Sequence, residues 1–138
     1  MKRTAKAHWS GNLKEGKGTL TTQSGVLNNT NYSFKTRFEE SEKGTNPEEL
    51  LAAAHAGCFT MAVSSILTQK GLYPTSLDTE ATLSMEGLVI TGIYLSITGS
   101  VSGVNFEEFK TITKDAEKNC LISKVLSIHI RSEAHFIA

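Results

Sequence analysis

The sequence has no excess of charge of either sign, because 14 Lys and Arg residues balance 14 Asp and Glu residues. It also has no run of basic residues, so we do not expect a nucleic-acid partner, which requires a concentrated basic surface. No apolar run follows Lys2 and Arg3, and a secretory signal peptide is therefore not expected either. Reducing cytoplasm is the compartment that these absences favour. No internal repeat or linker divides the chain, and its 138 residues predict one domain, residues 1–138.

Cysteine is scarce: the chain has only Cys58 and Cys120. Under reducing conditions two cysteines indicate redox or catalytic thiols rather than a structural disulfide. Their spacing alone leaves a second interpretation open, in which both are inert core thiols, since free cysteine is among the most buried residue types.

The sequence also lacks a complete set of metal ligands. His55 and Cys58 share one helical face, but two ligands are too few for a structural zinc site and no CxxC or HxxxH motif completes the set. We therefore expect no metal and interpret His55 as a hydrogen-bonded core histidine. The glycines form no phosphate-binding pattern and no serine lies in a nucleophile-elbow motif, so no cofactor is expected.

Asp, Glu, Lys and Arg are all absent from residues 50–69. This stretch continues a helix that Asn46 can cap, with Pro47 suited to the first helical position and Glu49 at capping-box spacing. Gly71 and a later proline end it. Because apolar residues occur on every side, we expect this helix to be buried and to run through the middle of the protein.

A membrane span is the alternative to weigh for the same helix, since about 20 apolar residues can cross a bilayer. The stretch carries six polar side chains, namely His55, Thr60, Ser64, Ser65, Thr68 and Gln69. Their insertion cost argues against a span, and no association with a membrane is expected.

Period-two and helical patterns predict the remaining elements. Strands are expected over residues 4–9, 19–26, 32–38, 75–85, 88–101 and 127–137. Residues 39–44 form a charged loop, Asn105 caps an amphipathic helix containing Phe109 and Ile112, and a short helical turn covers residues 121–126. The order βββ-α-ββ-αα-β predicts an α+β fold with antiparallel sheets around the long buried central helix.

Five segments together resemble a known family. They are Ala7-His-Trp9, the run from Gly16 to Leu27, Phe34-Lys-Thr-Arg-Phe38, Gly44-Thr-Asn-Pro-Glu-Glu-Leu50 and Ala52-Ala-Ala-His-Ala-Gly-Cys-Phe59. This pattern resembles the OsmC branch of the OsmC/Ohr family (osmotically inducible protein C and organic hydroperoxide resistance protein). The match extends from about Ala7 to the final strand.

The resemblance implies a thiol-dependent peroxidase of organic hydroperoxides. By motif, Cys58 corresponds to the peroxidatic thiol and Cys120 to the resolving thiol, while Arg37 and Glu48 correspond to the charged pair that activates the thiol. The sequence departs from the family at one point, since Leu121 follows Cys120 where the family commonly has proline.

These residue types suit the implied chemistry. A thiol in an apolar helix is unreactive unless a cation stabilises its thiolate, and the guanidinium of Arg37 stays charged when buried. It can also stabilise the departing alkoxide. The sulfenic acid left on Cys58 would condense with Cys120 to a disulfide, which an external dithiol must reduce. Flavin, haem and metal are not required.

The resemblance is also consistent with an intertwined homodimer. On one continuous helix Glu48 and Cys58 would lie about 15 Å apart along the axis, too far to share one arginine directly. Antiparallel packing of two such helices would bring both thiols of one subunit to Arg37 and Glu48 of the other. The alternative is a helix that breaks near Ala56-Gly57 and folds back within one chain.

Two other functions remain open on the sequence. One is a non-catalytic OsmC-like protein that binds an apolar small molecule in the same groove. The other is a structural stress protein whose thiols are inert. Neither would consume peroxide.

Overall fold

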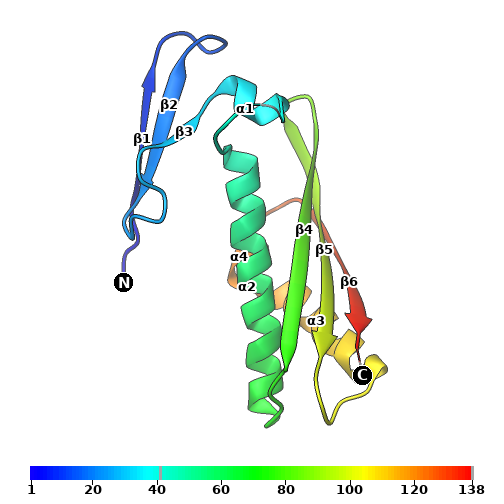
Figure 1. The fold of residues 1–138 in the computed structure, drawn as a ribbon. Coiled ribbons are helices and arrows are strands. Elements are labelled where there is room, and N and C mark those ends of the chain that lie inside the picture. Colours follow the sequence, from blue (N-terminus) through cyan, green and yellow to red (C-terminus); the bar gives the residue numbers. More distant parts are fainter. Residues whose placement is uncertain (41, 138) are drawn as a thin grey trace. The chain divides into compact units, whose positions relative to one another are not determined.

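The computed structural model describes residues 1–40 and 42–137 and is shown in Figure 1. The chain forms two compact units, the N-terminal unit Met1–Leu50 and the C-terminal unit Leu51–Ala138. Ser41, part of the predicted charged loop 39–44, lies outside the described residues.

The N-terminal unit contains an antiparallel sheet in the order β1-β2-β3. Its strands are Ala5–Ser10 (β1), Lys17–Thr22 (β2) and Thr30–Tyr32 (β3). The first predicted strand is confirmed, whereas the second begins and ends earlier than predicted. The rings of Trp9 and Tyr32 lie 5.5 Å apart above Gly18, where a Cβ atom would come within 2.7 Å of the Trp9 ring. A side chain at Gly18 would therefore displace this aromatic pair.

The predicted strand over residues 32–38 is wrong, because Phe34–Phe38 form a short helix, α1. The hydroxyl of Ser33 accepts a hydrogen bond from the Thr36 N–H at 3.1 Å, and Thr36 Oγ1 accepts one from the Ser33 N–H at 2.8 Å. This reciprocal cap satisfies the free backbone donors of a helical turn. The aromatic residues whose alternation suggested a strand are instead neighbours on the helix. Phe34 and Phe38 lie one turn apart, with 5.1 Å between their ring centroids.

The long helix is confirmed as α2, Pro47–Gln69, and its cap is the predicted one. Asn46 Oδ1 accepts a hydrogen bond from the Glu49 N–H at 2.7 Å. The helix is continuous, so the predicted alternative of a break at residues 56–57 is wrong.

Burial of α2 on all sides is not observed. A single stripe of residues spaced four apart is buried: His55, Phe59, Val63 and Leu67. The opposite stripe is exposed and consists of Ala53, Gly57, Met61 and Ser65. The helix is long and apolar enough to cross a membrane, but only 22% of its most apolar window is buried within the chain. The uncharged sequence thus reflects one face that packs in the core of the C-terminal unit and one largely apolar face that lies outside that core.

The C-terminal unit contains a second sheet in the order β4-β5-β6. Strands β4 (Ser76–Glu86) and β5 (Val89–Ser100) form an antiparallel hairpin, as predicted. Strand β6 (His129–Phe136) pairs with β5 in parallel, so the expectation of antiparallel sheets alone is wrong. The reason is the connection, because residues 101–128 form α3 (Phe106–Asn119) and α4 (Leu121–Val125), which return the chain to the start of the sheet.

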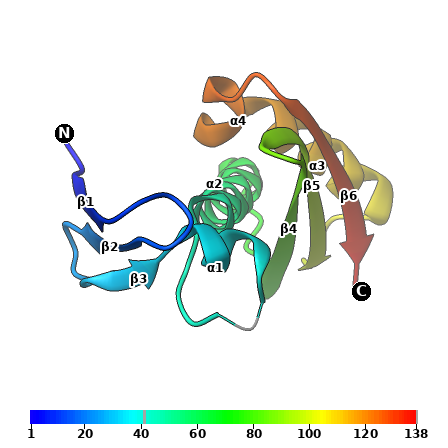
Figure 2. The same ribbon diagram turned by 90° about the horizontal axis from the view of Figure 1, so that it is seen from above.

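The core of the C-terminal unit lies between its sheet and its helices. The predicted inward residues of β5, Ile93, Leu95 and Ile97, are all buried. They belong to one cluster with Phe59 of α2 and Phe109 of α3. Figure 2 is a view along α2 and shows β4, β5 and β6 standing beside it. Apart from the added helix α1, the element order matches the predicted α+β order βββ-α-ββ-αα-β.

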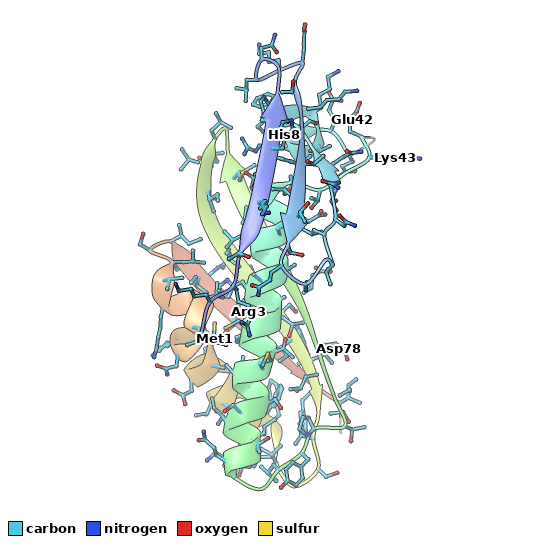
Figure 3. All side chains as sticks on the ribbon, turned by 90° about the vertical axis from the view of Figure 1, so that its left-hand side faces the viewer. Met1, Arg3, His8, Glu42, Lys43 and Asp78 are labelled. Atoms are coloured by element: carbon cyan, nitrogen blue, oxygen red, sulfur yellow. The ribbon has the colours of Figure 1, made fainter. Side chains whose placement is uncertain are left out.

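The other face of this sheet is polar. The Tyr94 hydroxyl donates a hydrogen bond to Glu133, and this bond is the main cause that raises the pKa of Tyr94 and lowers the pKa of Glu133. The guanidinium of Arg131 lies 5.1 Å from the Tyr94 ring centroid. Asp78 of β4, labelled in Figure 3, pairs with Thr98, which lies on the same face of β5 as Tyr94. This face is a solvated surface, in contrast to the apolar face toward α2.

Candidate active site

Arg37 and Glu48 form an ion pair in the N-terminal unit. Arg37 Nε lies 2.9 Å from Glu48 Oε1, and the side chains are only 27% and 16% exposed. Arg37 lies in the last turn of α1 and Glu48 lies in the first turn of α2, where a carboxylate is favoured by the helix dipole. Arg37 Nε and Glu48 Oε2 have no well-aligned hydrogen-bond partner in the described chain, so the contact is an ion pair with unused hydrogen-bonding capacity.

A hollow of about 290 Å³ is lined in part by Arg37. Its other walls are mostly aromatic or apolar and include Trp9, Tyr32, Phe34 and Pro47. Apolar walls with one charged group are typical of sites for small, largely apolar ligands.

Cys58 lies midway along α2 and is a free, half-buried thiol. It packs against the apolar core cluster of the C-terminal unit. The predicted position of Cys58 on the long helix is therefore confirmed.

Cys120 is also a free thiol, but it is only 2% exposed. It ends α3 and caps α4, where its sulfur accepts a hydrogen bond from the Ser123 N–H at 3.3 Å. Ser123 Oγ lies 3.0 Å from the same sulfur. Leu121, the departure from the family pattern, is the first residue of α4, a position that proline also favours. Helix α4 thus begins normally despite the replacement.

His55 is fully buried on α2, and its Nε2 lies 2.8 Å from Ser123 Oγ. Burial lowers the pKa of His55, because the charged imidazolium is poorly solvated in the core. The interpretation of His55 as a hydrogen-bonded core histidine is confirmed. No role was predicted for Ser123, although its position three residues after Cys120 is a signal, since residues at that spacing can form a helix cap.

The structure brings one pair of the predicted residues into contact and places the other pair in the same unit. Arg37 meets Glu48 in the N-terminal unit, while both cysteines belong to the C-terminal unit. The other three histidines lie on strands: His8 on β1, labelled in Figure 3, and His129 and His135 on β6. Among residues 1–40 and 42–137, no three His, Cys, Asp or Glu residues are grouped as metal ligands.

Solved structures identify the fold class. An OsmC-like protein of unknown function from Vibrio cholerae aligns with a TM-score of 0.76 over 97% of this chain and 99% of that chain, at 17% identity. The organic hydroperoxide resistance protein OhrB of Bacillus subtilis aligns with a TM-score of 0.69 over 97% and 98% of the two chains, at 21% identity. The α+β architecture is therefore that of OsmC-like and Ohr proteins.

The chain belongs to the OsmC-like protein family, whose sequence model matches residues 40–134. It is 49% identical to peroxiredoxin OsmC of Escherichia coli K12 over 128 residues, covering 90% of this chain and 89% of the relative. It is 32% identical to the organic hydroperoxide resistance protein OhrA of Bacillus subtilis over 99 residues, 68% of each chain. The family resemblance inferred from the motifs is confirmed.

Proposed function

We propose that this protein is a thiol-dependent peroxidase that reduces organic hydroperoxides to alcohols. A peroxide-related redox role is what the names of its relatives share, since one is a peroxiredoxin and another an organic hydroperoxide resistance protein. The four residues assigned to the chemistry are Cys58, Cys120, Arg37 and Glu48.

The observation that carries the proposal is the partly buried ion pair between Arg37 and Glu48. A guanidinium stays charged in such a site, and the carboxylate at 2.9 Å offsets its charge. The hollow beside Arg37 has apolar walls, which favours an organic hydroperoxide over hydrogen peroxide.

The reaction uses only protein thiols and an external reductant. The Cys58 thiolate attacks the terminal oxygen of the hydroperoxide, the O–O bond breaks, and the alkoxide leaves with the electron pair and takes up a proton. Arg37 stabilises the thiolate and the leaving alkoxide. Cys120 then attacks the sulfenic sulfur of Cys58, which releases water and forms a disulfide. A dithiol reduces that disulfide by two successive thiol exchanges, and no metal or organic cofactor takes part.

The proposed enzyme is a cytoplasmic homodimer with sites shared between subunits. The exposed stripe of α2, which includes Ala53, Gly57 and Met61, is uncharged and supports coverage by a second copy. The helix is unbroken, so it does not fold back at residues 56–57 to bring Glu48 to Cys58 of the same chain. Both thiols of one subunit would then work with Arg37 and Glu48 of the other.

Titration of free thiols tests the proposal. The reduced protein is mixed with one equivalent of cumene hydroperoxide, and the thiols remaining are counted with an alkylating reagent. Both cysteines should be lost together while the hydroperoxide is converted to its alcohol. Persistence of both thiols and of the hydroperoxide would contradict the peroxidase and favour a protein that merely binds an apolar ligand. Hydrogen peroxide is the comparison substrate and should react more slowly.

A further inference from the structure

Two hydrogen-bond donors of one residue converge on the sulfur of Cys120. The Ser123 N–H donates to Sγ at 3.3 Å, so the sulfur already acts as an acceptor in the cap of α4. The Ser123 hydroxyl lies 3.0 Å from the same atom and can donate a second bond. It donates this bond only if its O–H points toward the sulfur. That direction depends on His55, which contacts the same hydroxyl.

His55 controls that direction through its protonation. Its lowered pKa keeps the imidazole neutral near pH 7, so only one ring nitrogen carries a proton. Nδ1 is buried and has no hydrogen-bond partner in the described chain. A proton on Nδ1 would leave a buried N–H donor unpaired, which is rarer in proteins than an unpaired acceptor. The proton therefore resides on Nε2, which donates to Ser123 Oγ at 2.8 Å. The serine hydroxyl is then free to donate its own proton to Cys120 Sγ.

We propose that His55 and Ser123 are positioning residues that prepare the Cys120 sulfur to leave as a thiolate, so that an external dithiol attacks the oxidised protein at Cys58. This inference rests on the proposed Cys58–Cys120 disulfide. One thiolate of the dithiol forms a bond to Cys58 Sγ, the Sγ–Sγ bond breaks, and its electron pair passes to Cys120. The second thiol of the dithiol then displaces Cys58 as a thiolate, and the reductant becomes a disulfide.

The difference in exposure between the two cysteines also favours attack at Cys58. Cys58 is half-buried, whereas Cys120 is 2% exposed and belongs to the core cluster. Exchange depends on access to the attacked sulfur and on stabilisation of the leaving one. Access favours Cys58 as the sulfur attacked, and the two donors of Ser123 favour Cys120 as the sulfur that leaves.

The proposal is tested by finding which cysteine forms the mixed disulfide with an added thiol. The Cys58–Cys120 disulfide is prepared with diamide, which does not depend on hydroperoxide chemistry. It is exposed to 2-mercaptoethanol, quenched by alkylation and analysed by peptide mass mapping. The 2-mercaptoethanol adduct should be found on Cys58. An adduct mainly on Cys120 in the unaltered protein would overturn the inference without any variant.

Variants test the two positioning residues. Ser123→Ala removes the hydroxyl donor and should slow disulfide reduction about tenfold, the effect expected for one lost hydrogen bond, while more of the adduct moves to Cys120. Ser123→Thr retains a hydroxyl and should restore most of the rate. His55→Gln keeps an N–H donor and should be less impaired than His55→Leu.

Thr113→Val is the matched control, since Thr113 is also fully buried and its hydroxyl has no partner among the described residues. It should keep the unaltered rate and adduct position. Equal rates for Ser123→Ala and Thr113→Val would overturn the role of Ser123. Failure of diamide to form the disulfide would also overturn the inference.

The inference and the proposed peroxidase activity can fail separately. If the disulfide does not form but Cys58 consumes hydroperoxide, only the inference fails. If the protein is inert to hydroperoxide but the adduct is found on Cys58, only the peroxidase activity fails.

Discussion

Arg37 Nε lies 2.9 Å from Glu48 Oε1 and joins the end of α1 to the first turn of α2. Arg37→Met removes the cation, so alkylation of Cys58 at neutral pH should slow and kcat/KM for a hydroperoxide should fall on the order of 10²-fold. Arg37→Lys should recover only part of this loss, because a strongly hydrated ammonium replaces a planar guanidinium whose several donors have fixed directions. Stopped-flow alkylation over a pH series measures the effect.

Lys35→Met is the control for Arg37→Met, because Lys35 is exposed on the same short helix. It removes the same charge without touching the ion pair and should leave alkylation unchanged. If Arg37→Met alkylated like Lys35→Met at every pH, Arg37 would have no part in activating the thiol.

The two cysteines should differ in their substitution phenotypes. Cys58→Ser should abolish hydroperoxide reduction, because no other residue is assigned as the nucleophile. Cys120→Ser should allow one turnover and then leave Cys58 as a sulfenic or overoxidised acid, which mass spectrometry detects. Sustained turnover of Cys120→Ser with a dithiol would show that Cys120 is not the required resolving thiol, and activity in Cys58→Ser would refute the central assignment.

Mixed dimers test whether the sites are shared. A Cys58→Ser subunit combined with a Glu48→Ala subunit should leave one of the two sites intact if one subunit supplies both thiols and the other both charged groups. About half of the unaltered activity should then return. Homodimers of each variant are the controls, and a mixed dimer no more active than these would exclude shared sites.

Burial of His55 predicts a pH dependence of stability. Its pKa is lowered in the folded chain, so below about 6.5 the unfolded chain binds a proton that the folded chain does not. The free energy of unfolding should therefore fall as the pH falls below about 6.5, by at most about 1.4 kcal/mol per pH unit from this residue. His55→Gln has no titrating group there, and urea unfolding from pH 7 to pH 5 should show a shallower decline. Parallel declines would contradict the assignment.

Gly99 of β5 packs directly against the ring of Phe109 of α3. A Cβ atom at this position would overlap the ring of Phe109, which is fully buried. Gly99→Ala should destabilise the fold by about 1–3 kcal/mol, the usual cost of overpacking a core. Thr98→Ala, on the opposite face of the strand, is the control in denaturant unfolding. Equal midpoints for the two variants would contradict this packing.

Local signals predicted several elements well. Asn46 caps α2 and Asn105 caps α3 as expected, because a cap depends on residues within one turn. The alternation of Ile93, Leu95 and Ile97 predicted the buried face of β5, since strand periodicity directly separates two faces.

Features that depend on competing or distant interactions were not predicted. In residues 32–38 the alternation favoured a strand, but the Ser33–Thr36 cap favoured a helix and prevailed. The parallel pairing of β6 depends on where the crossover returns the chain, which no local pattern encodes. Likewise, the contact between His55 and Ser123 joins residues 68 positions apart. The Arg37–Glu48 pair came from the family motif rather than from spacing.

The parallel pairing of β6 has a consequence during synthesis of the chain. Strand β5 is the middle strand of its sheet, and its second neighbour is the last of the described strands to leave the ribosome. Until β6 arrives, a nascent chain presents one edge of β5, with unpaired backbone groups beside its most apolar side chains. Such an edge can pair with another unfinished chain. Ribosome-bound or truncated forms that lack residues 129–136 should therefore need a chaperone more than the finished protein does.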